Sequence, residues 1–201
     1  MTATLNEALQ IAGPAGTLEA RLTGPGTDRI AVLCHPHPQY GGSMHDGVLA
    51  ILAECLADAG VASLRFNFRG VGASAGTHDG KGGERGDLKA VIGWVRSTYP
   101  EVPLLLGGYS FGASIVSTLA DPGAVEQILL IAPPVGNLAT KAPDGSIPVH
   151  VFVGDQDAFV DLTALEAAWT EAAIHVLPGA DHFFGSAVGD LQAAISAALT
   201  R

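Results

Sequence analysis

The stretch that decides the fold is "VPLLLGGYSFGASIVSTLA", residues 102–120. It joins a short apolar run, typical of a buried strand, to a helical pattern, and a G-x-S-x-G motif (108–112) lies at the junction. A strand that turns sharply into a helix lifts the serine hydroxyl above the sheet, and the amides of the helix N-terminus face the same space. Gly108 and Gly112 fit such a turn, where strand and helix pack too closely for side chains. Ser110 is therefore predicted to be a nucleophile, with an ordinary turn serine as the alternative.

The same motif occurs a second time, as "GASAG" at 72–76. Ser74 follows the apolar run "RFNF" (65–68), but a Gly- and Asp-rich stretch without helical periodicity comes after it. Because no helix follows, we interpret Ser74 as a turn serine.

A serine nucleophile needs a base, and the base needs an acid that orients it. In a strand-turn-helix site these follow in the order Ser, acid, His. His182, in "VLPGADHFFG" (176–185), is the only histidine on a loop beyond both Ser110 and a suitable acid. The chain order therefore predicts His182 as the base.

Three aspartates follow the preceding strand pattern, in "VHVFVGDQDAFVD" (149–161). Asp157 is favoured as the acid, because a residue two or three positions past the strand end reaches most easily toward the His182 loop. Asp155 is expected to cap the turn and stays open as the alternative acid. Asp161 directly precedes a helical pattern and is its expected N-cap.

Short strand patterns alternate with helical patterns after an initial stretch that reads as all strand, which is typical of an α/β sheet with antiparallel strands at its start. A length of 201 residues fits one domain, 1–201. Strands are expected at 4–10, 17–22, 29–34, 61–68, 102–108, 126–132, 147–154 and 173–179, and helices at 46–59, 84–98, 111–120, 162–172 and 187–199.

The composition, 48% apolar and 15% charged residues, is that of a folded globular protein. The net charge of −10 argues against nucleic acid and anionic membranes as partners. The N-terminal residues lack a signal-peptide pattern, and no apolar run is long enough to span a bilayer, so a cytoplasmic protein is expected. Cys34 and Cys55 lie in apolar patterns and are expected to be reduced, buried thiols.

Five motifs follow the predicted strands in order: "HPHP" (35–38), "RFNFRGVGASAG" (65–76), "GYSFG" (108–112), "GDQD" (154–157) and "GADHFF" (179–184). With these motifs the chain resembles the α/β-hydrolase superfamily, and within it small, lidless bacterial serine hydrolases with some similarity to dienelactone hydrolases. The resemblance implies a mostly parallel eight-stranded sheet with an antiparallel second strand, flanked by helices. Dienelactone hydrolases proper carry cysteine at the elbow, so their substrate does not carry over.

Larger relatives insert a lid after the sixth strand, whereas here only "PPVGNLATKAPDGSI" (133–147) separates two strands. We therefore expect no cap domain, and even the helix usual at that point is expected to be missing. The cleft should be open and suited to small or surface-presented esters.

The stretch "CHPHPQYGGSMH" (34–45) places His35, His37 and His45 close together, which permits a metal site. The interleaved prolines make the backbone extended, and no Cys, Asp or Glu is spaced to complete a ligand set. No metal and no cofactor are therefore predicted.

A better role for this stretch is to supply an amide to an oxyanion hole, together with the amide of Phe111. In relatives the loop after the third strand has this task. Prolines have no N–H group, which leaves His37 as the expected donor and Tyr40 as the fallback. Tyr40 and Met44 are candidates for lining the cleft, or for ordinary packing.

The resulting expectation is a serine hydrolase that cleaves small-acyl esters or thioesters through an acyl-enzyme, acting on a small molecule as a monomer or homodimer. The alternatives are a non-catalytic binding protein of the same fold and a metal-dependent hydrolase using His35, His37 and His45. Arg69 with Glu84 and Asp87 is expected to form a structural ion pair at a helix start.

Overall fold

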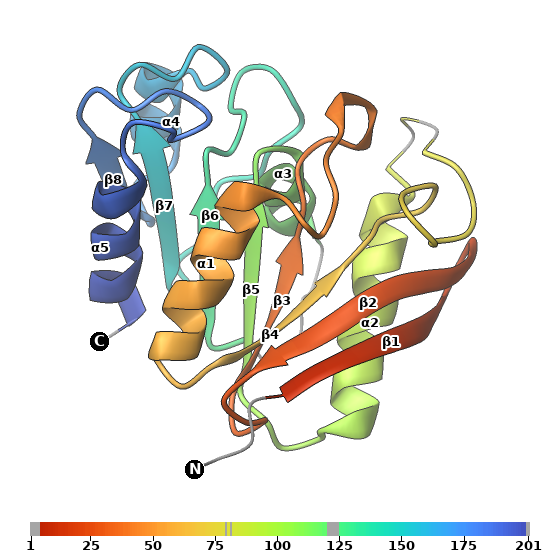
Figure 1. Cartoon of the computed structure of the whole chain (residues 1–201). Helices are drawn as coiled ribbons and strands as arrows, with labels where there is room; N and C mark the ends of the chain where they lie inside the picture. Colours follow the sequence, from red (N-terminus) through yellow and green to blue (C-terminus); the bar gives the residue numbers. More distant parts are fainter. Residues whose placement is uncertain (1–4, 79, 81, 120–124, 200–201) are drawn as a thin grey trace.

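The computed structural model describes residues 5–78, 80, 82–119 and 125–199, and these residues form one eight-stranded sheet flanked by helices (Figure 1). The strand order is β1-β2-β4-β3-β5-β6-β7-β8. β2 pairs antiparallel with β1 and with β4, and the other pairs are parallel, as the resemblance implied. The strands are β1 (Leu5–Gly13), β2 (Gly16–Gly24), β3 (Ile30–Cys34), β4 (Ala62–Phe66), β5 (Leu104–Tyr109), β6 (Gln127–Ile131), β7 (Val149–Gly154) and β8 (Ala173–Leu177).

The helices cover both faces of the sheet. Helices α1 and α5 pack against each other on one face, and α2 and α3 pack together on the other (Figure 1). A short 3-10 helix (Pro38–Tyr40) follows β3. The α-helices are α1 (Gly47–Asp58), α2 (Glu84–Thr98), α3 (Phe111–Ser117), α4 (Leu162–Ala168) and α5 (Val188–Leu199).

The central strands are mostly apolar because helices cover them on both sides. Every residue of β3, β5 and β7 is buried, whereas β1, at the sheet edge, is largely exposed. Cys34 and Cys55 are buried free thiols within this core, as expected.

The N-terminal hairpin is longer than the predicted strands at 4–10 and 17–22. Gly13 pairs with Gly16 across a two-residue connection, so the ladder continues up to the turn. The helix predicted at 162–172 ends at Ala168, after which Trp169 packs into the core. Residues 4 and 120, at the ends of a predicted strand and a predicted helix, lie outside the described residues.

The connection between β6 and β7 contains no helix, so the prediction of a missing helix and no cap at this point is confirmed. The Ser114 hydroxyl donates a hydrogen bond to the Ala139 carbonyl and ties this connection to α3. Among the described residues, no helix is both long and apolar enough to cross a membrane.

Candidate active site

Ser110 lies at the sharp turn between β5 and α3. Its φ of 53° is in the left-handed region, and its amide donates to the Ile131 carbonyl of the neighbouring strand at 2.9 Å. A Cβ atom at Gly112 would lie 2.1 Å from the Cys34 carbonyl oxygen, so only glycine lets α3 start this close to β3. The structure therefore forms the strand-turn-helix geometry that the sequence predicts around Ser110.

His182 and Asp157 lie next to Ser110, on the loops after β8 and β7. His182 Nε2 is 3.0 Å from Ser110 Oγ, and His182 Nδ1 is 2.7 Å from Asp157 Oδ2. A carboxylate only accepts hydrogen bonds, so the proton of the neutral imidazole is on Nδ1, and Nε2 is left to accept the serine proton. The three side chains thus form one hydrogen-bonded chain that can activate a hydroxyl.

Neighbouring groups hold the Ser110, His182 and Asp157 side chains in position. The second oxygen of Asp157 accepts the Phe159 amide at 2.8 Å, and the Tyr109 hydroxyl donates to the His182 carbonyl at 3.0 Å. The rings of Phe159 and Phe183 pack against the His182 imidazole, with centroids 4.7 and 5.6 Å away. Burial raises the pKa of Tyr109, so its hydroxyl keeps the proton that it donates.

The other two aspartates of the β7 loop have structural bonds. Asp155 Oδ1 accepts the Gly179 amide at 2.7 Å and joins the β7 loop to the β8 loop. Asp161 caps α4 by accepting the Ala164 amide at 2.9 Å. Both agree with the turn and N-cap roles expected from the sequence.

The backbone amides of His37 and Phe111, near Ser110, have no hydrogen-bond acceptor among the described residues. The fallback donor Tyr40 is engaged, since its amide donates to the His37 carbonyl at 3.1 Å. The His37 and Phe111 rings are in contact, with centroids 4.8 Å apart, so the two residues are neighbours. Two unpaired amides beside a serine hydroxyl are what an oxyanion requires.

Known proteins of similar sequence and fold include serine hydrolases. Residues 27–138 match the family described as serine aminopeptidase, S33. XC6422 from Xanthomonas campestris, described as an α/β serine hydrolase without lid, is 35% identical and has a TM-score of 0.89, with coverage of 99% of this chain and 95% of that chain. The chain belongs to the α/β serine hydrolase family.

Two further relatives are similar to this chain over most of its length. An α/β serine hydrolase homologue from Coxiella burnetii is 34% identical with a TM-score of 0.86, covering 99% of this chain and 100% of that one. The uncharacterized protein RP471 of Rickettsia prowazekii is 34% identical over 92% of this chain and 84% of its own length.

The three histidines of the 34–45 stretch have separate surroundings in this hydrolase. His35 is fully buried; its Nε2 accepts the Phe68 amide at 3.1 Å and its Nδ1 donates to the Pro36 carbonyl at 2.6 Å. His37 begins the short 3-10 helix and accepts the Gln39 amide through Nδ1, while His45 is exposed. The described residues include no group of three or more His, Cys, Asp or Glu arranged to hold a metal ion.

The remaining predicted residues have packing or hydrogen-bond partners other than the Ser110 hydroxyl. Tyr40 is 87% exposed and packs its ring on His37, and Met44 is buried with its amide donating to Asn67 Oδ1. Ser74 is a buried loop serine that donates to the Asn67 carbonyl and accepts the Glu19 amide, which matches its interpretation as a turn residue.

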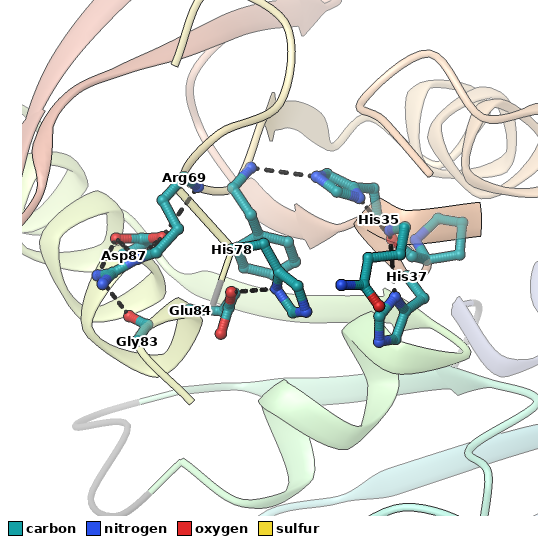
Figure 2. A network of polar contacts seen from close by, with 10 residues as sticks. His35, His37, Arg69, His78, Gly83, Glu84 and Asp87 are labelled. Carbon is teal, nitrogen blue, oxygen red and sulfur yellow. Dashed lines mark hydrogen bonds and ion pairs between the residues drawn. The ribbon is translucent and has the colours of Figure 1, made fainter. Parts of the chain in front are cut away.

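One polar pair beside the site was not predicted. His78 Nδ1 is 2.6 Å from Glu84 Oε1, and both side chains are buried (Figure 2). The expected ion pair of Arg69 forms with Asp87, at 2.7 Å, whereas Glu84 is paired with His78. The only sequence signal was an acidic residue at a predicted helix start, which by itself indicates a dipole interaction and not a histidine partner.

Cavities lined by described residues lie near α3, and none of Ser110, Asp157 and His182 lines either cavity considered below. One, of 480 Å³, lies between α3, β6 and the 141–147 segment. The other, of 330 Å³, is lined by His37 and Phe111, whose amides are unpaired, and by the pair His78 and Glu84. We consider the smaller cavity the functional candidate, because position beside the reacting groups matters more than size.

Proposed function

We propose that this protein hydrolyses carboxylic esters or thioesters of small acyl groups through an acyl-enzyme intermediate. The observation that supports the proposal is the chain of hydrogen bonds from Asp157 through His182 to Ser110, beside two unpaired amides. No step of this mechanism needs a cofactor.

In the first half-reaction Ser110 Oγ attacks the carbonyl carbon while His182 Nε2 takes the hydroxyl proton. Asp157 keeps the imidazole in the required tautomer and stabilises the imidazolium. The amides of His37 and Phe111 bind the oxyanion of the tetrahedral intermediate. The bond to the alcohol or thiol then breaks, and the leaving group takes the proton from His182.

In the second half-reaction a water molecule replaces the leaving group. His182 removes its proton, the hydroxide oxygen attacks the acyl carbon, and Ser110 leaves with the proton returned by His182. Small acyl groups are favoured because the described residues form no cap over the site and the adjoining cavity, at 330 Å³, is near the lower end of ligand pockets.

The test is hydrolysis of a short p-nitrophenyl ester and a short-chain thioester by the wild type and by Ser110→Ala, Asp157→Asn and Asp155→Asn. Ser110→Ala should lose nearly all activity, and Asp157→Asn should lower kcat by about 10⁴-fold, because asparagine favours the wrong imidazole tautomer. Asp155→Asn is the matched control and should change kcat little.

Two results would contradict the proposal. Undiminished turnover by Ser110→Ala would remove the serine from the reaction. Failure of a fluorophosphonate to label Ser110 in the folded wild type would instead favour a non-catalytic binding protein of the same fold.

A further inference from the structure

The cavity beside the oxyanion amides lies on the acyl side of the substrate, if the proposed mechanism holds. His182 must protonate the leaving group, so the alcohol or thiol has to lie at His182. The cavity contains none of Ser110, Asp157 and His182 among its lining residues, and instead includes His37 and Phe111, the residue that directly follows Ser110. The carbonyl substituent that faces away from His182 is the acyl chain.

The cavity has both apolar and polar lining residues. Phe111, Ile115 and Leu138 are apolar, and His78 and Glu84 are among the polar ones. The His78 ring stands 5.0 Å from that of His37 and 5.8 Å from that of Phe111, centroid to centroid. A group bound at His78 is therefore only a few bonds away from a carbonyl held by the amides.

Glu84 determines which hydrogen bond His78 can offer. Its carboxylate accepts from Nδ1, so the proton of the neutral imidazole is on Nδ1 and Nε2 is an acceptor. Nε2 has no partner among the described residues, and it is not among their buried unpartnered atoms, so it keeps accessible surface in a residue that lines the cavity. Figure 2 shows Glu84 and His78 facing each other, with His37 on the other side of the His78 ring.

The surrounding fold holds the His78–Glu84 pair in place. Glu84 is fully buried at the first turn of α2, where the helix dipole favours a negative charge, and its second oxygen has no described partner. The preceding loop is attached to α2 through Arg69, which bonds to Asp87 and to the Gly83 carbonyl (Figure 2). An oriented acceptor at a cavity wall points to a ligand that donates a hydrogen bond.

We infer that His78, oriented by Glu84, recognises a hydroxyl group on the acyl chain, so that the substrates are esters or thioesters of hydroxylated acids. An ammonium group is the other common donor. The carboxylate of Glu84 lines this cavity too but is engaged with His78, whereas the positive charge of Arg85 disfavours a second cation there. The inference rests on the proposed esterase or thioesterase reaction and adds the substrate class to it.

The test compares kcat/KM for the 4-methylumbelliferyl esters of hexanoate, 3-hydroxyhexanoate, 6-hydroxyhexanoate and 6-aminohexanoate. The wild type should prefer at least one hydroxylated ester over hexanoate by about tenfold, the size expected for one hydrogen bond to an otherwise unpaired acceptor. His78→Phe should reduce this ratio to near one while hexanoate is still cleaved. His45→Phe, the same change at an exposed histidine, should keep the preference.

The outcomes separate the inference from the proposed function. Three results would overturn the hydroxyl assignment and leave the proposed hydrolase function intact. The wild type could cleave the hexanoate ester without preferring a hydroxylated ester, His78→Phe could retain that preference, or the wild type could prefer the amino ester. If His78→Phe does not fold, His78→Gln is the substitute, because it keeps an acceptor in a smaller side chain and should retain part of the preference. An unchanged preference, or its complete loss, in His78→Gln would count against the assignment. A wild type that cleaves no ester or thioester would remove the proposed function and this inference with it.

Discussion

His35 illustrates how a histidine beside an active-site loop can be structural. Both of its ring nitrogens are hydrogen bonded, Nε2 as acceptor and Nδ1 as donor, and this arrangement requires the neutral ring. Burial lowers the pKa of His35 to about 4. Protonation would place a second proton on Nε2 and break the bond to the Phe68 amide.

This burial predicts a loss of stability in acid. In the unfolded chain His35 should titrate near pH 6.5, so between about pH 6.5 and about pH 4 the unfolded chain holds a proton that the folded chain lacks. The free energy of unfolding should therefore fall as the pH falls through this window, with a contribution of up to about 1.4 kcal/mol per pH unit from His35.

Urea unfolding of wild type and His35→Gln at several pH values would measure this contribution. Glutamine can accept the Phe68 amide but does not titrate, so the variant should show a shallower decline of stability between about pH 6.5 and about pH 4. Identical slopes for the two proteins would mean that His35 is not the group responsible.

At the scale of elements, the close approach of α3 to β3 positions Ser110. Gly112 is in the first turn of α3, and any Cβ there would collide with the Cys34 carbonyl of the neighbouring strand. Gly93, in the middle of α2, is also a helical glycine, but it is exposed and nothing lies within 4 Å of its Cβ position. Gly93 therefore offers a control for a substitution at Gly112.

Gly112→Ala should lower the free energy of unfolding by about 1–3 kcal/mol and remove most of the esterase activity, because α3 must move and shift Ser110 from His182. Gly93→Ala should raise stability by about 0.5–1 kcal/mol without changing activity. Urea unfolding and ester turnover of both variants test this. A fully active, stable Gly112→Ala protein would show that the elbow tolerates displacement.

Elements with a local signature could be predicted from the sequence. The positions of Ser110, Asp157 and His182 follow from the apolar strands directly before them, because parallel strands end at a common edge. The partnership of His78 with Glu84 could not be predicted in this way. The loop that contains His78 has no periodic pattern, so its path depends on tertiary contacts such as that of Arg69 with Asp87. Hairpin length and helix ends were also inexact, since they depend on turn pairing and on packing of residues such as Trp169.

At the scale of the whole molecule, the candidate site is assembled from the carboxyl ends of five strands. Loops after β3, β4, β5, β7 and β8 contribute His37, His78, Ser110, Asp157 and His182, respectively. Ligand sites of open α/β sheets lie at this edge. The exposed rings of Phe159 and Phe183 border His182 at this edge.

The missing cap predicts kinetics without interfacial activation. Because the described residues form no lid that would have to open, the rate on a short triglyceride such as tributyrin should rise smoothly through the substrate's solubility limit. Initial rates measured below and above that limit would test this. A sharp increase at the limit would indicate a closed state that opens at an interface.

The backbone of Ser110 has a consequence for the molecule as a whole. A non-glycine residue with φ 53° and ψ −115° costs on the order of 1–3 kcal/mol, a sizeable share of the stability of an ordinary domain. Selection for thermal stability alone would therefore favour glycine at position 110 and lose the hydroxyl. A serine there keeps the hydroxyl at the expense of stability, and directed evolution for heat resistance without an activity screen should inactivate the protein.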